Sequence, residues 1–243
     1  MVQCMISSPR SLTGDFDLET LNQRFETATP QHILSWAINN IPEGLVQTSA
    51  FSLLVITDML YRELKPNPPI PVLFLDTLHH FRETLETVDR AKSRYNLDLR
   101  VYRAKGVSSR ETFAARYGEA LWEQDIAQFH YLTKVEPLQR ALEEIGVTAW
   151  ITGRRREQAS TREQMPILER DGDGRLKINP LANWSRNDVW SYTLKHHVPY
   201  NPLHDQGYAS IGDEPLTTRV NPGEHERAGR WRGSGKTECG IHI

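Results

Sequence analysis

The sequence has few cysteines and lacks long apolar runs. Only Cys4 and Cys239 occur among its 243 residues. Two widely separated thiols cannot form a disulfide framework, and without other ligands they cannot hold a four-cysteine iron–sulfur cluster or a structural zinc ion. We therefore expect no bound metal or cluster. No apolar stretch approaches the roughly 20 residues that span a bilayer, and residues 1–14 lack the regions of a secretory leader, so we expect a cytoplasmic protein without a membrane partner.

A large excess of either charge is also absent. The chain has 29 lysines and arginines and 31 aspartates and glutamates, which gives a formal net charge of -2. Binding to nucleic acid depends on a broad basic face, so this balance predicts no nucleic-acid partner. With 38% hydrophobic and 25% charged residues, the composition is typical of an ordinary globular protein.

Apolar and amphipathic segments alternate along the chain. This pattern predicts an α/β fold, with a doubly wound, mainly parallel sheet and flanking helices. Strands are expected at 44–50, 72–77, 97–104 and 147–153, and helices at 51–64, about 81–95 and 135–146. The predicted division of the chain is a helical lead-in (1–40), an α/β domain (41–201) and a mobile C-terminal segment (202–243), in which glycine, proline and charge replace the periodic pattern.

The turn after the first expected strand carries three hydroxyl groups, on Thr48, Ser49 and Ser52. Ligands of such sheets bind at the carboxyl ends of the strands. Backbone N–H groups at a helix start, together with these hydroxyls, would bind a phosphate or sulfate oxygen, although serine and threonine are also common helix caps. The lysine-bearing P-loop pattern is absent, and no acidic residue in the turn could hold magnesium, so ATP cleavage is not expected.

The second expected strand ends at Asp76. Its carboxylate could accept hydrogen bonds from a ribose or an adenine amine, but an aspartate in this position is as often a helix cap. His79 and His80 follow. Adjacent side chains diverge on a helix, so this pair does not predict a metal site.

The fourth expected strand leads into GRRREQASTR (153–162), which has four arginines in ten residues. A basic run is usually a solvated surface. This one follows a buried strand and a glycine at the ligand-binding edge of the sheet, and arginine forks bind phosphate and sulfate bidentately. The run therefore favours a small polyanionic ligand.

Cys239 lies between Glu238 and Gly240 in KTECGIHI (236–243). A thiol in a core behaves as a small buried hydrophobe, whereas a thiol on a glycine-flanked flexible segment can meet water and react. The position of Cys239 thus indicates chemistry.

Several stretches occur together: QTSAF (47–51), LDTLHHFRET (75–84), KVEPLQRAL (134–142), ITGRRREQASTR (151–162), YNPLHDQGYASIGDEPLTT (200–218) and KTECGIH (236–242). They resemble the thioredoxin-dependent phosphoadenylyl-sulfate (PAPS) reductase family, over about residues 47–242. The resemblance implies a modified PP-loop fold of the adenine-nucleotide-hydrolase-like kind, a homodimer, and a role in sulfate assimilation. The implied reaction converts PAPS and reduced thioredoxin to sulfite, adenosine 3',5'-bisphosphate and oxidised thioredoxin, with no bound cofactor.

The resemblance also implies a mechanism and a set of site residues. Cys239 would attack the sulfonate sulfur to give an S-sulfocysteine, which thioredoxin then resolves. The nucleotide-binding candidates are Thr48, Ser49, Ala50, Phe51, Ser52, Asp76, Thr77, Arg154, Arg155, Gln158 and Arg162, of which Ser52 stands where the family commonly has glycine. Arg227, Arg230 and Lys236 are candidates for clamping phosphate or sulfonate, or are merely solubilising charges. Trp184 and Trp190, near the start of a further expected helix, fit core packing better than nucleotide stacking.

Three alternatives remain open at this point. One is an adenylyl-sulfate (APS) reductase without an iron–sulfur cluster, which would run the same chemistry on a substrate that lacks the 3'-phosphate. Another is a non-redox protein that binds an adenine nucleotide and in which Cys239 is incidental. An ATP-splitting ligase of the same superfamily is disfavoured, because the turn lacks its S-G-G-x-D-S pattern.

Overall fold

A six-stranded sheet forms the centre of the computed structural model, which describes residues 16–241. The strand order is β3-β2-β1-β4-β6-β5, and the strands run parallel except for β5, which is antiparallel to β6. The strands are β1 (Leu45–Thr48), β2 (Val72–Leu75), β3 (Leu99–Tyr102), β4 (Ala149–Ile151), β5 (Leu168–Arg170) and β6 (Leu176–Ile178). This mainly parallel sheet confirms the predicted fold class.

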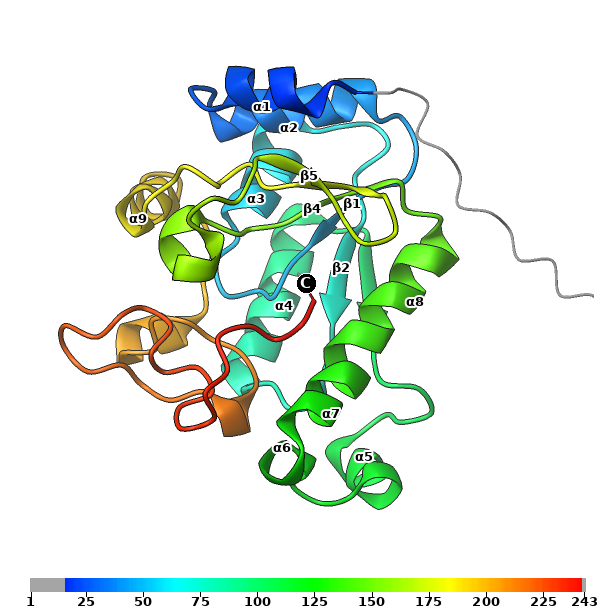
Figure 1. Ribbon diagram of the computed structural model, residues 1–243, viewed down its shortest axis with the longest axis vertical. Helices are drawn as coiled ribbons and strands as arrows, with labels where there is room; N and C mark the ends of the chain where they lie inside the picture. The colour runs from blue at the N-terminus through cyan, green and yellow to red at the C-terminus, as the bar shows by residue number, and fades with distance from the viewer. Residues whose placement is uncertain (1–15, 242–243) are drawn as a thin grey trace, which may run out of the picture.

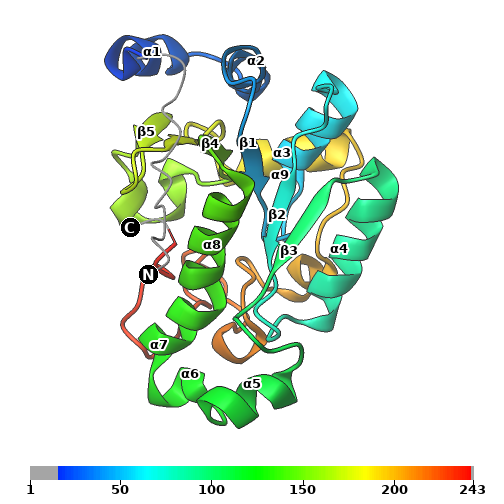
Figure 2. The ribbon, with the colours of Figure 1, turned by 90° about the vertical axis from the view of Figure 1, so that its right-hand side faces the viewer.

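Helices cover both faces of the sheet, with α8 on one side and α3, α4 and α9 on the other (Figure 2). The α-helices are α1 (Leu18–Phe25), α2 (Pro30–Asn40), α3 (Val55–Asp58), α4 (Arg82–Tyr95), α5 (Arg110–Tyr117), α6 (Leu121–Gln124), α7 (Ile126–His130), α8 (Glu136–Ile145) and α9 (Arg186–Lys195). Two π-helical turns extend this set, η1 (Met59–Leu64) after α3 and η2 (Tyr131–Val135) between α7 and α8. Helices α1 and α2 occupy the expected helical lead-in.

Side chains that alternate along the strands supply two apolar cores. Val46, Leu73 and Trp150 pack with α8 on one face. Their sequence neighbours Leu45 and Phe74 belong to the larger core, which includes residues of α2, α3, α4 and α9. Because successive side chains of a strand point to opposite faces, short strands buried on both sides appear as continuous apolar runs in the sequence.

The expected helix 51–64 begins later than predicted, at Val55. Phe51 has a left-handed φ of 51°, and its side chain is buried at 5.2 Å from the ring of Phe74. The chain therefore turns sharply between β1 and α3, with Phe51 anchoring the turn in the core. Residues 51–54 of this buried turn are as apolar as the helix that follows, so the apolar pattern of residues 51–64 did not show where the helix begins.

Helices α5 to α7 and the hairpin of β5 and β6 were not predicted. Each strand of the hairpin has three residues, which is too short to show a period in the sequence. The aspartates and glycines of DGDG (171–174) gave the only signal, and Asp171 closes the turn by accepting hydrogen bonds from Asp173 N and Arg175 N.

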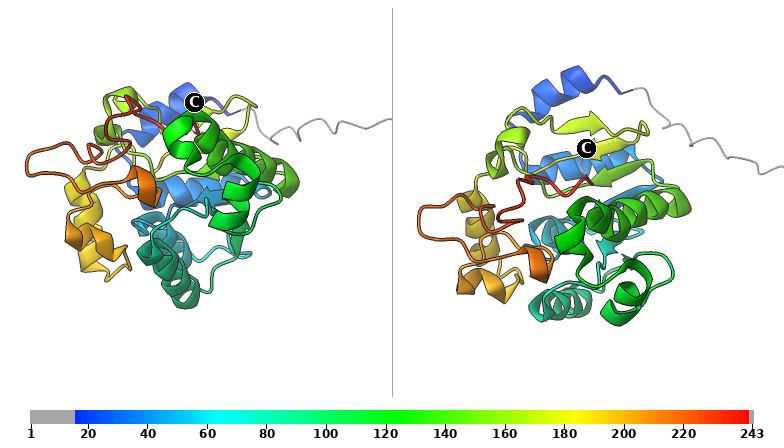
Figure 3. Two further views of the ribbon diagram at one scale, coloured as in Figure 1. Left: turned by 90° about the horizontal axis from the view of Figure 1, so that it is seen from below. Right: turned by 60° about the horizontal axis from the view of Figure 1, so that its bottom comes forward.

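The C-terminal segment crosses the sheet where the strands end. In Figure 1 the arrow of β2 points downward and this segment, orange to red, runs across the lower half of the view. Figure 3 shows it passing from beside the yellow α9 toward the green α8. Asp213 and Trp231 of this segment are buried, and Ile241 packs against the apolar core beside α8. The expected mobility of the segment stays a prediction, and Cys4 lies outside the described residues.

Within residues 16–241, no helix combines the length and the apolar character that a membrane span requires.

Candidate active site

A cavity of about 300 Å³ lies at the carboxyl ends of β1 and β4. Its walls come from segments far apart in the sequence, namely 47–56, 152–158, 186–190, 209–213, 226–231 and 238–241. The first two segments are the strand ends predicted to bind a ligand, and the last three belong to the C-terminal segment. The fold thus brings the hydroxyl turn, the arginine run and Cys239 to one place.

The turn after β1 lines the cavity through Thr48, Ser49, Ala50 and Ser52. Ser49 Oγ accepts a hydrogen bond from the backbone N–H of Phe51 at 3.2 Å, and Ser52 Oγ lies 2.9 Å from His204 Nε2. The hydroxyl of Ser52 therefore points to the C-terminal segment and helps to hold that segment against the turn. Phe51, by contrast, has its side chain in the core and outside the cavity wall.

Asp76 and Thr77 do not line this cavity. Asp76 Oδ2 accepts a hydrogen bond from Arg103 Nε at 2.7 Å, and Asp76 Oδ1 accepts one from the backbone N–H of Leu78. Leu75 and His80, on either side of these two residues, are part of the wall instead. The expected contact of the Asp76 carboxylate with a nucleotide therefore has no support from its position.

The arginine run divides between the cavity and the outer surface. Arg154 and Arg155 line the cavity, and Arg155 Nη2 donates to both carboxylate oxygens of Glu226, at 3.0 and 2.8 Å. Burial, with a contribution from the charge of Arg162, lowers the pKa of Arg154 to about 10. Arg156 instead binds Glu26, which ties the run to the end of α1. Arg156 is thus a structural residue.

Gln158 organises the arginine run. Its Oε1 accepts hydrogen bonds from the backbone N–H of Arg155 at 3.0 Å and from Arg162 Nη1 at 2.6 Å. Arg162 in turn holds Glu238, the residue before Cys239, with a distance of 2.7 Å from both Nε and Nη2 to the carboxylate.

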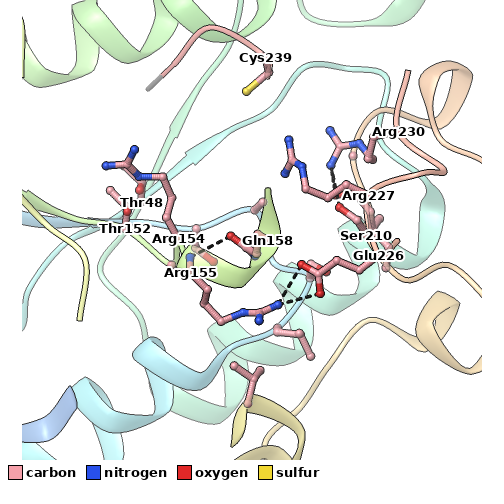
Figure 4. Close-up of a pocket in the computed structure, with 18 of the residues that line it drawn as sticks. Thr48, Thr152, Arg154, Arg155, Gln158, Ser210, Glu226, Arg227, Arg230 and Cys239 are labelled. Carbon is pink, nitrogen blue, oxygen red and sulfur yellow. Dashed lines mark hydrogen bonds and ion pairs between the residues drawn. The ribbon is translucent and has the colours of Figure 1, made fainter. Parts of the chain in front are cut away.

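The C-terminal segment contributes Arg227, Arg230 and Cys239 to the wall. In Figure 4 the sulfur of Cys239 points into the space between Arg154 on one side and Arg227 and Arg230 on the other. A negative charge on the Cys239 sulfur would raise the pKa values of Arg227 and Arg230. Burial and Arg162 lower the pKa of Arg227 to about 10, and burial also lowers that of Arg230. Lys236 lies apart, against a neighbouring cavity, 3.5 Å from His130 Nδ1.

Sequence reasoning missed Lys134, a second cation source in the wall. It lies on the π-helical turn η2, is buried, and donates to Asp213 Oδ2. π-Helical turns are frequent at functional sites. The stretch KVEPLQRAL that carries Lys134 counted toward the family resemblance, but Lys134 was not among the candidate site residues. No local pattern pairs it with Asp213, which is 79 residues further along the chain.

Trp190 was expected to serve core packing and instead lines the cavity. Its ring makes edge contacts with Tyr200 at 5.1 Å and His204 at 5.3 Å. Trp184 packs on Tyr192 beside the larger core, as predicted. The two tryptophans are six residues apart, so they lie at different positions around the start of α9 and meet different neighbours.

Positive charge dominates the cavity wall. Seven cationic and three anionic side chains line it, namely Lys134, Arg154, Arg155, Arg162, Arg186, Arg227 and Arg230 against Asp213, Glu226 and Glu238. An excess of four positive charges in a concave, partly buried site attracts a polyanion. Within the described part of the chain, no group of histidine, cysteine and acidic side chains could hold a metal ion. The arrangement therefore suits a thiol that acts on a bound polyanion.

Residues 46–219 match the family model of the phosphoadenosine phosphosulfate reductase domain. The chain belongs to this family. It is 47% identical over 229 residues to a phosphoadenosine phosphosulfate reductase of Emericella nidulans, a match that covers 93% of this chain and 74% of that protein. It is also 43% identical to an adenosine 5'-phosphosulfate reductase of Lysinibacillus sphaericus, over 86% of this chain and 89% of that protein. The predicted family is confirmed.

Solved structures agree with the family assignment. A crystal structure of phosphoadenylyl-sulfate reductase from Candida auris, in a phosphate complex, has a TM-score of 0.75 and 42% sequence identity, and the match covers 84% of this chain and 96% of that chain. FMN adenylyltransferase of Candida glabrata has a TM-score of 0.59 at 18% identity, covering 89% of this chain and 71% of that chain, which shows a shared fold alone. The predicted adenine-nucleotide-hydrolase-like fold is confirmed.

Proposed function

We propose that this member of the PAPS reductase family reduces PAPS to sulfite and adenosine 3',5'-bisphosphate with electrons from thioredoxin, in sulfate assimilation. The position of Cys239 carries the proposal, because its sulfur faces a cavity with four excess positive charges (Figure 4). A binding protein would need the cations but not the thiol. The pairing of a thiol with an anion site is what sulfonate transfer to a cysteine requires.

The first step is attack of the Cys239 thiolate on the sulfur of the sulfate group. A bond forms between the two sulfur atoms, and the bond from that sulfur to the bridging phosphate oxygen breaks. The oxygen keeps the electron pair, so adenosine 3',5'-bisphosphate leaves and Cys239 carries the sulfonate. Arg227 and Arg230 lie where they can stabilise the negative charge that shifts to the leaving phosphate.

Thioredoxin completes the reaction. One of its thiolates attacks the Cys239 sulfur, and sulfite leaves with the electron pair of the broken sulfur–sulfur bond. The second thioredoxin thiol then resolves the mixed disulfide and returns Cys239 as a thiol. Two electrons pass from the thioredoxin dithiol to the sulfur that leaves as sulfite, and no bound cofactor is needed.

Charge favours PAPS over APS as the substrate. The 3'-phosphate adds about two negative charges to a nucleotide whose sulfate and 5'-phosphate carry about two more. PAPS thus matches the four excess positive charges of the cavity, whereas APS leaves about half of them unbalanced. A relative named as an APS reductase at 43% identity makes APS reduction the second candidate.

Cys239 must be reached by two partners of very different size. It is half-buried and lines the cavity in which the nucleotide would bind. We propose that the C-terminal segment 202–243 opens after sulfonate transfer, and that this movement exposes the adduct. We extend the proposal to a homodimer, as the family resemblance implies, and to the cytoplasmic location that the sequence led us to expect. Light scattering after size-exclusion chromatography tests the dimer.

The intact mass of the reduced protein after incubation with PAPS, without thioredoxin, tests the proposal. We expect one sulfonate group on Cys239 by peptide mapping, and its loss as sulfite when thioredoxin is added. Cys239→Ser should still bind adenosine 3',5'-bisphosphate but gain no sulfonate. A parallel incubation with APS decides between the two substrates. An unmodified Cys239 under conditions in which PAPS binds would refute the mechanism.

A further inference from the structure

Glu238, the residue directly before Cys239, is held by the arginine run. Arg162 Nε lies 2.7 Å from Oε1 and Arg162 Nη2 lies 2.7 Å from Oε2, which is a bidentate pair. Arg227 Nη2 adds a contact with Oε2 at 3.3 Å, and Thr161 Oγ1 lies 3.4 Å from Oε1. The side chains of Arg162 and Glu238 are only 8% and 16% exposed. Burial and the fork geometry make this pair stronger than a surface ion pair.

Each of the three guanidinium nitrogens of Arg162 donates a hydrogen bond to the protein itself. Nε and Nη2 serve Glu238, and Nη1 donates to Gln158 Oε1 at 2.6 Å. Arg230 differs, because its Nε is buried and has no hydrogen-bond partner among the described residues. The cavity therefore contains two kinds of arginine. Arg162 binds the C-terminal segment, whereas Arg230 has an Nε–H that can donate to a ligand.

The chain on the other side of Cys239 is also anchored. Gly240 has a left-handed φ of 94°, and a Cβ there would lie 3.4 Å from Val135. Ile241 packs with the apolar core beside α8. Cys239 thus lies between a polar anchor at Glu238 and an apolar one at Ile241.

We propose that Arg162 is a positioning residue, which binds Glu238 of the C-terminal segment rather than the nucleotide. The Glu238–Arg162 pair holds the Cys239 sulfur in position over the substrate. This inference rests on the proposed function. It assigns the anion of the substrate to the remaining cations, among them Arg230 and Arg154. Adjacent Cα atoms are about 3.8 Å apart, so fixing the Glu238 carboxylate leaves the neighbouring thiol little freedom.

The opposite possibility is that Glu238 blocks the site by imitating an anionic group of the substrate. In that case the nucleotide would have to displace the carboxylate from Arg162 and Arg227. Removing the carboxylate would then strengthen nucleotide binding and speed the reaction. If the pair positions Cys239, removing the carboxylate should slow the reaction and leave nucleotide binding nearly unchanged. Measurements of rate and binding on the same variants therefore distinguish the positioning role from the blocking role.

The test uses two single variants, Glu238→Gln and Arg162→Gln, and the exchange Arg162→Glu with Glu238→Arg. All carry Cys4→Ser, so that Cys239 is the sole thiol. Three quantities are measured: the rate of Cys239 S-sulfonation at saturating PAPS without thioredoxin, the Kd of adenosine 3',5'-bisphosphate by calorimetry, and the rate of Cys239 alkylation by iodoacetamide.

We expect each single variant to slow S-sulfonation about 10- to 100-fold, since a misplaced reacting group lowers the rate by about this factor. The Kd should change less than about threefold, and alkylation should become faster as the tail loosens.

The exchanged pair should recover part of the lost rate, because the attraction is restored with reversed sign. Arg156→Gln is the matched control, since Arg156 belongs to the same run but pairs with Glu26 outside the cavity. It should leave all three quantities unchanged.

Three outcomes would overturn the proposal. Tighter nucleotide binding or faster S-sulfonation in Glu238→Gln would show that Glu238 blocks the site. A Kd raised tenfold or more by Arg162→Gln, but not by Glu238→Gln, would show that Arg162 binds the nucleotide. Wild-type rates in both single variants would show that the pair is irrelevant. Should the wild type itself gain no sulfonate, the proposed function fails, while the alkylation rates still report on the pair.

Discussion

At the scale of single residues, the cavity depends on charges that are buried with their partners. Asp213 is fully buried, and its Oδ2 accepts a hydrogen bond from Lys134. Burial alone would raise the pKa of Asp213, but Lys134 and other nearby cations lower it well below its usual range. Because Asp213 fixes the ammonium of Lys134 at the cavity wall, the pair places a positive charge where a substrate anion can meet it.

Removing one partner of this pair should destabilise the protein strongly. Asp213→Asn leaves the Lys134 ammonium buried without a counter-charge, and we expect a loss of about 3 kcal/mol in the free energy of unfolding. The neighbouring Glu214 is the control, since it forms its ion pair with Arg110 at an exposed position. Glu214→Gln should lower the free energy of unfolding by less than about 1 kcal/mol. Equal effects of the two variants in urea denaturation would contradict this account of the pair.

The residues of the site differed in how far the sequence revealed them. Thr48, Ser49 and Arg154 were predictable, because each lies at or just after the end of a strand at the ligand-binding edge of a parallel sheet. Lys134 and Asp213 were not, since their contact joins residues far apart in the chain. A side chain shows its type in the sequence, but its partner is set by the packing of other elements.

At the scale of elements, the turn before β1 is set by a close approach of two backbones. Gly44 has a left-handed φ of 72°, and a Cβ there would lie 2.7 Å from the carbonyl oxygen of Gly146 and 2.8 Å from the backbone nitrogen of Thr148. Gly146 has nearly the same φ, 71°, but no atom lies within 4 Å of its would-be Cβ. Comparing substitutions at the two glycines therefore distinguishes the cost of backbone strain, which both would carry, from the cost of a steric clash, which only Gly44 would carry.

Alanine at these two positions should therefore have unequal effects. Gly146→Ala carries the strain of a left-handed alanine, and we expect a loss of about 1 to 2 kcal/mol in the free energy of unfolding. Gly44→Ala carries this strain and the clash with Gly146 and Thr148, just before β4, which adds about 1 to 3 kcal/mol. Thermal and urea unfolding of both variants measure the difference. A Gly146→Ala variant that is as unstable as Gly44→Ala would show that strain alone decides.

The elements that were predictable are those with an apolar signal long enough to read. The strands β1, β2, β3 and β4 and the helices α4 and α8 lie within their predicted ranges. β1, β2 and β4 are buried and therefore appear as apolar runs, whereas the edge strand β3 is partly exposed. The start of α3 was misplaced, since the buried turn at Phe51 is as apolar as a helix. The arrangement of β5 and β6 follows from their pairing beside β4, which no short segment encodes.

At the scale of the whole molecule, several histidines are kept neutral by burial. Burial lowers the pKa of His130 to about 3 and that of His204 to about 4, and it also lowers the pKa values of His79 and His80. In the unfolded chain these side chains take up protons near pH 6.5. The unfolded state therefore binds more protons than the folded state below this pH, and acidification destabilises the protein.

We expect the free energy of unfolding to fall as the pH is lowered from 6.5 to 5, a window above the range in which carboxylates titrate. Each histidine that stays neutral contributes a slope of at most about 1.4 kcal/mol per pH unit. His204→Gln should flatten the measured slope by up to this amount, whereas a glutamine at the exposed His225 should not. Urea denaturation at several pH values gives the slopes. Identical slopes for the wild type and His204→Gln would contradict the neutral state of His204.

The sequence by itself determined the fold class, the family and the residue types of the site. Apolar periodicity encodes strands and helices locally, and motifs such as the arginine run and the stretch around Cys239 are contiguous. Only the tertiary structure decided that Phe51 belongs to the core, that Asp76 faces Arg103, and that Arg162 holds Glu238. The physical reason is that the position of each of these side chains depends on partners that packing brings close. The geometry of a contact between distant segments cannot be predicted from either segment alone.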